Sequence, residues 1–163
     1  MTLILSADCD WAIGKDGGLL AHIPEDMKFF RTATADSVVV MGRKTWDSLP
    51  KKPLAGRYNC VLSRDGAQRE GAQVFRSVEE FLEFAKTAPG RIYVIGGAEV
   101  YNELLPYCSE ALITRVYECF GGDTFFTDIE HDRQWELAEV SPTVYSECRT
   151  IRFFRYVRKA SAD

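Results

Sequence analysis

The carboxylate of Asp26 lies in a segment whose apolar spacing predicts a helix. Pro24 suits the first position of that helix. At 3.6 residues per turn, Ile23, Met27 and Phe30 fall on one face, and Asp26 shares it. A carboxylate on a core-facing stripe must be paired, hydrogen-bonded or protonated, because burying it bare is costly. Asp26 is therefore a candidate for binding or catalysis. The alternative is an ordinary acidic residue in a first helical turn, where the helix dipole favours it.

Three short segments that could hold an anion follow predicted strands. They are Gly42–Thr45, with an arginine and a lysine; Leu62–Arg64, with a hydroxyl and a guanidinium; and Ile95–Ala98, with two glycines. Glycine lets the backbone approach a ligand, helix starts offer free N–H groups, and arginine brings charge. Each segment alone could be a solvated turn, and the full Gly-x-Gly-x-x-Gly pattern is absent. Together they suit an elongated ligand with separated phosphates, such as a dinucleotide with a 2′-phosphate.

The elements that must position these groups alternate between strands and helices. We predict strands at 2–7, 38–41, 58–62, 91–95, 111–118, 135–140 and 150–159, and helices at about 23–30, 44–49, 78–85 and 98–105. This alternation indicates one α/β domain over residues 1–163, with a mostly parallel twisted sheet and flanking helices. The last two strands have no helix between them, which predicts an antiparallel C-terminal edge. Ligands of such sheets bind beyond the carboxyl ends of the strands, and we expect residues 160–163 to fray.

Composition narrows the function classes. The net charge of −4 over 163 residues argues against a nucleic-acid or membrane-surface binder. No apolar run reaches membrane-spanning length, and the N-terminus lacks the pattern of a signal peptide. With two histidines and five scattered cysteines, no metal site of recognisable spacing can be drawn. The odd cysteine count predicts reduced thiols in a cytoplasmic protein, and we expect a monomer.

A set of motifs, in order along the chain, identifies a family. They are Ile13-Gly14, Ile23-Pro24-x-Asp26-Met27-x-x-Phe30, Met41-Gly42-Arg43-Lys44-Thr45-Trp46, Leu54-x-Gly56-Arg57-x-Asn59, Leu62-Ser63-Arg64, Ile95-Gly96-Gly97-x-x-Val100-Tyr101 and Gly122-Asp123-Thr124-x-Phe126. In these motifs the sequence resembles the bacterial dihydrofolate reductases over essentially its whole length. The resemblance implies NADPH-dependent reduction of 7,8-dihydrofolate to 5,6,7,8-tetrahydrofolate, with hydride transfer to C6 and protonation at N5. It also implies binding of antifolate inhibitors.

The resemblance also implies roles at the substrate end. Asp26 is the expected pterin-binding acid and Thr114 its supporting hydroxyl, the two catalytic assignments. Arg57 is expected to hold the glutamate α-carboxylate of the substrate through its two-pronged guanidinium. The residues expected to wall the pterin and its aminobenzoyl arm, or to lie near them, are Ile4, Met27, Phe30, Leu49, Leu54, Ile95 and Tyr101. Most of these apolar side chains could equally be core.

For NADPH, the resemblance implies a longer set of residues. Arg43 and Arg64 are the candidates for the 2′-phosphate, and Asp123 lies in a loop expected to brace the loop over the nicotinamide. The whole expected set is Ser6, Ile13, Gly14, Leu19, Gly42, Arg43, Lys44, Thr45, Leu62, Ser63, Arg64, Arg76, Gly96, Gly97, Ala98, Glu99, Val100, Tyr101 and Thr124.

The sequence departs from the family in one place. Where the family usually has Leu-Pro-Trp or Met-Pro-Trp, this chain has Leu19-Leu20-Ala21, followed by His22. Losing the proline frees the loop, and losing the tryptophan removes a large ring near the pterin. We interpret His22 as a solvated loop residue, and we expect water to deliver the N5 proton while Asp26 polarises the pterin.

Two other functions fit part of the pattern. A phosphoribosylamino-pyrimidine reductase of flavin synthesis, on the same fold, would keep NADPH but would need a ribose-phosphate site in place of the Asp26 set. A regulatory nucleotide-binding module would have lost catalysis, and the presence of Asp26, Thr114 and Arg57 argues against it.

Overall fold

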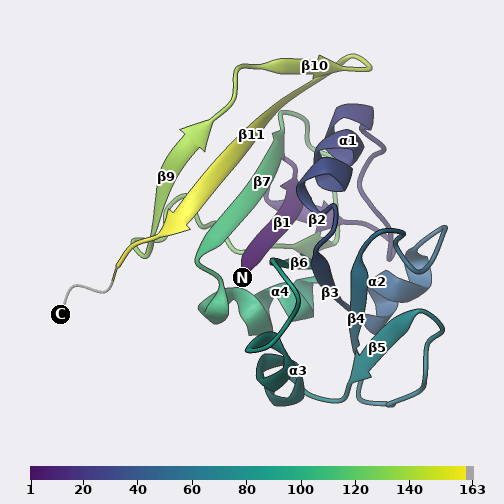
Figure 1. The fold of residues 1–163 in the computed structure, drawn as a ribbon. Coiled ribbons are helices and arrows are strands. Elements are labelled where there is room, and N and C mark those ends of the chain that lie inside the picture. Colours follow the sequence, from purple (N-terminus) through teal and green to yellow (C-terminus); the bar gives the residue numbers. More distant parts are fainter. Residues whose placement is uncertain (161–163) are drawn as a thin grey trace.

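A nine-stranded mixed sheet, in the order β10-β11-β7-β1-β6-β3-β4-β5 with β9 also paired to β11, forms the frame of this computed structural model (Figure 1). The structure describes residues 1–160, so the prediction of fraying concerns mainly residues outside the described part. The strands of the sheet are β1 Thr2–Ala7, β3 Val38–Gly42, β4 Tyr58–Leu62, β5 Ala72–Phe75, β6 Ile92–Gly96, β7 Glu110–Val116, β9 Trp135–Val140, β10 Val144–Ser146 and β11 Arg149–Arg158. A small second sheet pairs β2 Ala12–Gly14 with β8 Thr124–Phe125. The helices are α1 Pro24–Ala33, α2 Arg43–Ser48, α3 Val78–Ala85, α4 Ala98–Leu104 and the 3₁₀ helix η1 Leu105–Tyr107.

The strand directions confirm the predicted fold class. All pairings from β7 through β1, β6, β3 and β4 to β5 are parallel, and β11 is antiparallel to β7, β9 and β10. Strands β9, β10 and β11 run together along one edge in Figure 1. Val38–Met41 of β3 are completely buried near the centre, as their β-branched run predicts.

Alternation along the strands divides the core between the two faces of the sheet. On one face, Ile4, Val39 and Met41 pack with side chains of α1 and α2, including Phe30 and Trp46. On the other face, neighbouring positions of the same strands pack against α3 and α4. Successive strand side chains point to opposite faces, so a continuous apolar run serves both layers. Among residues 1–160, no helix combines the length and apolar composition needed to span a bilayer.

Some local structure was not predicted. Strand β5 and the short strands β2, β8 and β10 are additional to the predicted strands. At the start of α3, Ser77 accepts from the backbone N–H of Glu80 at 3.2 Å, as a helix cap should. The Glu80 side chain accepts from the N–H of Arg76 at 2.8 Å.

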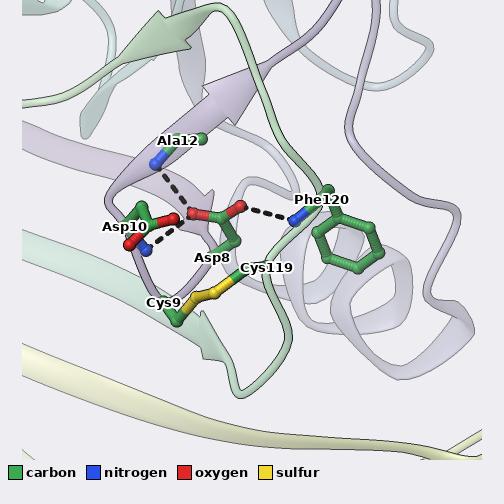
Figure 2. The surroundings of a disulfide bond; sticks show 6 residues. All are labelled: Asp8, Cys9, Asp10, Ala12, Cys119 and Phe120. Carbon is green, nitrogen blue, oxygen red and sulfur yellow. Dashed lines mark hydrogen bonds between the residues drawn. A yellow bond between two sulfur atoms is a disulfide. The ribbon is translucent and has the colours of Figure 1, made fainter.

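The prediction of reduced thiols is wrong for two of the five cysteines. Cys9 and Cys119 form a disulfide, with their Cα atoms 5.4 Å apart, while the other three are free (Figure 2). A separation of 110 residues hides this pair in the sequence. Buried Asp8 joins the same two loops, because its carboxylate accepts from the N–H groups of Ala12 and Phe120, each at 3.0 Å. The loop before β2 is thus tied to the loop after β7 twice.

Candidate active site

An open cleft of about 1710 Å³ crosses the carboxyl ends of β1, β3, β4 and β6. Parallel strands end together at this edge, as the predicted fold requires. Helix α1 and the loop of residues 13–23 form one side of the cleft, and the turn after β4 lies at the far side. Every residue expected to bind substrate or cofactor lines this cleft, and so does Asp26. Thr114 is the one expected site residue that does not.

Helix α1 places Asp26 in the cleft. Pro24 occupies the first helical position, and Ile23 is the residue before it, with no side-chain cap. The face carrying Asp26 was predicted to point into the core, which is wrong, because no residue of α1 is fully buried. Instead Asp26, Met27 and Phe30 line the cleft. The apolar face of α1 therefore borders the space for a ligand, and the Asp26 carboxylate belongs to that face.

Burial raises the pKa of Asp26, and a hydrogen bond from the Thr114 hydroxyl offsets part of that rise. Thr114 is only 1% exposed and lies on β7, behind the carboxylate. Burial also raises the pKa of Tyr101, and the charge of Asp26 raises it further. The Tyr101 hydroxyl is held by the Ile4 carbonyl, to which it donates at 2.8 Å. Within residues 1–160 no cation pairs with Asp26, so a ligand with N–H donors would be its best partner.

Arg57 stands at the outer part of the substrate end. Its Nε donates to the Thr34 hydroxyl at 3.2 Å, Nη1 to the Ala55 carbonyl at 2.7 Å and Nη2 to the Arg31 carbonyl at 3.0 Å. These bonds fix the plane of the guanidinium and use three of its five N–H groups. One N–H on each terminal nitrogen remains, which matches the two oxygens of a carboxylate.

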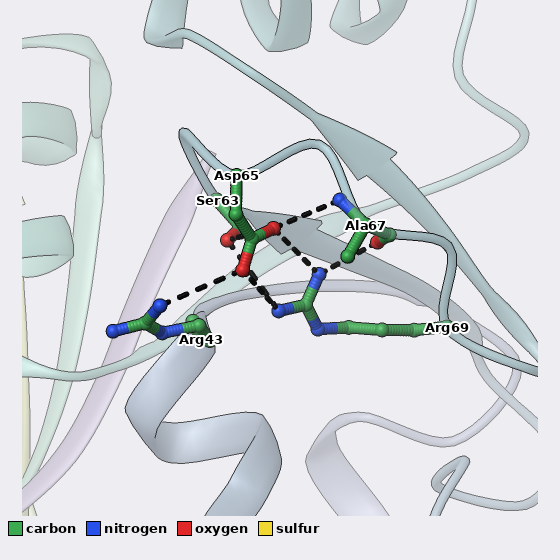
Figure 3. A network of polar contacts seen from close by, with 5 residues as sticks. All are labelled: Arg43, Ser63, Asp65, Ala67 and Arg69. Atoms are coloured by element: carbon green, nitrogen blue, oxygen red, sulfur yellow. Dashed lines mark hydrogen bonds and ion pairs between the residues drawn. The ribbon is translucent and has the colours of Figure 1, made fainter.

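The far end of the cleft holds arginines that are already paired with carboxylates. Arg43 Nη1 lies 3.5 Å from Asp65 Oδ2 (Figure 3), and Arg64 Nη2 lies 3.2 Å from Glu99 Oε1. Arg76 lies over the turn at Gly66, where an added Cβ would come within 2.3 Å of its Nε. Three guanidinium groups from three segments therefore line the cleft, a donor set that fits a phosphate.

Close backbone packing shapes the middle of the cleft. A Cβ on Gly42 would lie 3.1 Å from Val100 Cγ2, so the glycine lets β3 end against α4. Gly96 has a φ of +129°, a conformation that favours glycine. A Cβ there would lie 3.5 Å from the hydroxyls of Thr45 and Tyr101. The absence of side chains at these glycines keeps this part of the cleft open to a flat ligand.

A loop brace closes the cleft on the side of β2 and β8. Asp123 Oδ2 accepts from the N–H of Asp16 at 2.9 Å, and the N–H of Asp123 donates to the Gly14 carbonyl at 3.1 Å. A Cβ on Gly122 would approach Ala12 Cβ to 2.7 Å and the Gly14 carbonyl to 2.8 Å. The two loops are in contact, so the position of one sets that of the other.

A family model described as dihydrofolate reductase matches residues 1–158 of this chain. The chain belongs to the dihydrofolate reductase family.

Relatives support this over the full length. The dihydrofolate reductase of Neisseria meningitidis serogroup A is 36% identical over 159 residues, which cover 97% of this chain and 98% of the relative. That of Enterococcus faecium is 40% identical over 134 residues, 81% of this chain and 80% of the relative. Among solved structures, dihydrofolate reductase from Enterococcus faecalis, complexed with NADP(H) and RAB-propyl, superposes with a TM-score of 0.88 at 36% identity. That superposition covers 98% of this chain and 96% of the other.

The departure from the family motif has a visible consequence. Ala21 packs beside a small apolar cluster of Ile23, Val116 and Ile151, together with Phe120. Ala21, Val116 and Phe120 all line the cleft, so its wall continues past the place where family members carry tryptophan. His22 is exposed, as its interpretation as a loop residue expects.

Sequence reasoning did not include several residues that line the cleft. Val116 and Phe120 come from strand β7 and the loop after it, and no motif marked them. Asp65 was not among the predicted site residues, although it directly follows Arg64. A carboxylate next to a predicted phosphate-binding arginine is a signal that could have identified it.

Proposed function

We propose that this protein reduces 7,8-dihydrofolate to tetrahydrofolate with NADPH, in support of one-carbon, thymidylate and purine synthesis. The observation that carries the proposal is the half-buried carboxylate of Asp26 in an apolar cleft end, without a cationic partner among residues 1–160. Its two oxygens can accept side by side from a ring N–H and the 2-amino group of a pterin. The family and full-length relatives support the same reaction.

The substrate end supplies orientation. The apolar residues around Met27 and Phe30 would enclose the pterin and the aminobenzoyl arm, and Arg57 would hold the glutamate α-carboxylate. Three contacts fix these parts of one molecule: a carboxylate at one end, an apolar wall in the middle and a guanidinium at the other. Binding at separated points aligns the reacting carbon without strain on the protein.

The cofactor end fits NADPH through its donor set. Arg43, Ser63 and Arg64 would hold the 2′-phosphate, while the glycines at 96 and 97 leave room for the rest of the dinucleotide. When bound, NADPH supplies the hydride that reduces C6. The loop carrying Gly14 and Leu19, braced by Asp123, would cover the reacting atoms and exclude bulk water.

Protonation of N5 falls to water in this proposal. A carboxylate bound to the pterin amide edge cannot also reach N5 on the other ring. Asp26 would raise the basicity of N5 by placing negative charge on the far edge of the pterin. The small side chain of Ala21 in the cleft wall would leave room for water in that part of the cleft. A cationic inhibitor that donates to Asp26 would lower its pKa, which is the chemistry expected of antifolates.

Cofactor oxidation provides the test. NADPH absorbance at about 340 nm should fall only when dihydrofolate is present. Tight NADPH binding without turnover would favour the non-catalytic module. Turnover only with a phosphoribosylamino-pyrimidine would identify the flavin-synthesis reductase instead. Measuring both substrates on one preparation separates the three functions.

We also propose that the protein is a monomer and acts in the cytoplasm. The exposed aromatic side chains of Tyr107, Tyr117 and Tyr145 come from separate parts of the chain, which supports a monomer. The Cys9–Cys119 bond is the feature that disagrees with a reducing compartment. Light scattering would measure the oligomeric state, and alkylation of thiols in intact cells would show whether these two cysteines are reduced there.

A further inference from the structure

Asp65 lies in the turn after β4, at the cleft end where the 2′-phosphate of NADPH is expected (Figure 3). Two of its neighbours, Ser63 and Arg43, belong to the set expected to bind that phosphate. An acidic side chain is a poor neighbour for a phosphate dianion, since like charges repel. The proposed reaction does not explain why a carboxylate lies at this point.

The Asp65 carboxylate is fixed from several sides. Its Oδ1 accepts from the Ser63 hydroxyl at 2.8 Å and the Ala67 N–H at 2.9 Å. Arg69 reaches Oδ1 through Nη1 at 3.3 Å and Oδ2 through Nη2 at 3.1 Å. Hydrogen bonds from Arg69, the Ala67 N–H and the Ser63 hydroxyl lower the pKa of Asp65. The group is therefore charged at any pH where the enzyme would work.

Arg69 is the anchor of this arrangement and not a phosphate ligand. Its side chain is 10% exposed and does not line the cleft, whereas the side chain of Arg43 is 52% exposed and does. Arg69 also donates to the Ala67 carbonyl at 2.7 Å, which holds it in the turn. Arg69, which does not line the cleft, thus holds the Asp65 carboxylate in place, and Arg43 contacts the same carboxylate from the cleft side.

We propose that Asp65 sets the cofactor preference of this enzyme, by placing a carboxylate among the groups of the 2′-phosphate site and so narrowing the discrimination between NADPH and NADH. The inference rests on the proposed function, in which Arg43 and Arg64 face the 2′-phosphate. A phosphate there must share Arg43 with Asp65 and lie near its charge. The 2′-hydroxyl of NADH carries no charge and can donate to a carboxylate, as acidic residues accept from that hydroxyl in other dinucleotide sites.

The second arginine pair does not provide the same effect. The side chains of Arg64 and Glu99 are 86% and 75% exposed, and they contact each other at 3.2 Å without further anchors. Such an exposed pair is worth little and separates readily when a ligand arrives. Asp65 cannot move away in this manner, because four of its five contacts come from its own turn and from Arg69.

The test is the variant Asp65→Asn, assayed with dihydrofolate and either NADPH or NADH. Asparagine keeps an acceptor for Ser63 and Ala67 but removes the charge. We expect the ratio of kcat/KM values, NADPH over NADH, to rise about three- to tenfold. Asp65→Glu retains the charge and should leave the ratio near that of the parent. Glu139→Gln removes a carboxylate from an exposed ion pair with Arg155, outside the cleft, and is the control for net charge.

Binding without turnover separates this role from a purely structural one. By calorimetry, Asp65→Asn should bind 2′,5′-ADP more tightly than the parent does, while its affinity for 5′-ADP stays the same or falls. Equal changes for both nucleotides, or an unchanged cofactor ratio, would overturn the inference and leave Asp65 as a turn residue. The variant Arg43→Ala distinguishes a failure of the inference about Asp65 from a failure of the proposed cofactor site. If that variant binds 2′,5′-ADP as well as the parent, the phosphate lies elsewhere, and both the inference and the proposed cofactor site fail.

Discussion

Asp26 and Asp65 belong to the same cleft, at its β7–β1 and β4–β5 sides, and their surroundings shift their pKa values in opposite directions. At Asp26 the main effect is burial, which raises the pKa, and a single hydroxyl opposes it. At Asp65 hydrogen bonds from Arg69 and two further donors lower the pKa. The Asp26 carboxylate has no cationic partner within the described residues and is available to a ligand, whereas the Asp65 carboxylate already has its partners within the protein.

This difference shows how recognition is arranged at each end. At the substrate end, recognition of the pterin is concentrated in one carboxylate without a cationic partner, so removing that carboxylate should cost most of the activity. The cofactor end distributes recognition over several exposed, partly neutralised arginines, so removing any one should cost little.

Replacing Asp26 with Asn should have the largest effect. We expect kcat/KM for dihydrofolate at neutral pH to fall about a hundredfold or more, because the pterin loses its only charged partner. Activity should recover partly in acid, where the substrate protonates itself. A pH series of initial rates measures both effects. Asp47→Asn on α2, outside the cleft, is the matched control, and unchanged neutral activity in Asp26→Asn would contradict the assigned role.

Replacing Arg43 with Ala should have a smaller effect, about a three- to tenfold rise in KM for NADPH with little change in kcat. The guanidinium is half exposed and shared with Asp65, so its contribution to binding is partial. Arg64→Ala should behave similarly, and steady-state kinetics at varied NADPH measures each. If either variant lost as much kcat/KM as Asp26→Asn, the proposed difference between the substrate end and the cofactor end would be wrong.

Replacing Thr114 with Val should shift a pH profile more than a rate. The Thr114 hydroxyl lowers the pKa of Asp26, so its removal should raise that pKa further. The acid limb of the profile of kcat/KM should then move to higher pH, with a loss of about two- to fivefold at neutral pH. Thr114→Ser keeps the hydroxyl and should restore the profile. If Val and Ser variants share one profile, the hydroxyl does not act on Asp26.

The sequence predicted this contrast only in part. Val38–Met41, Ile92–Ile95 and similar β-branched runs indicate the buried parallel strands directly, and the fold then brings their carboxyl ends into one cleft. Helical periodicity, which is local, correctly places Asp26 on the same face as Met27 and Phe30, but it does not show that this face lines a cleft instead of the core. The partners of the charged groups do not follow, because they depend on which loops meet. The Cys9–Cys119 bond spans 110 residues. The Asp65–Arg69 pair is only four residues apart, but it forms in the irregular segment between β4 and β5, whose geometry no periodicity predicts.

The smallest expected effect is on thermal stability. The variant Asp26→Asn should be more stable than the parent at neutral pH, although it is less active. Because burial raises the pKa of Asp26 above its unfolded value, the folded state binds that proton more tightly than the unfolded state does. Asp26 therefore contributes most to stability in acid and loses that contribution as the pH rises through its raised pKa. Asp26→Asn removes a buried charge, so at neutral pH its Tm without ligands should exceed that of the parent by about 2–4 °C. Thermal melts at a series of pH values should show this gap closing as the pH falls through the raised pKa. A gap that persists at low pH would mean that the charge of Asp26 is not its cause.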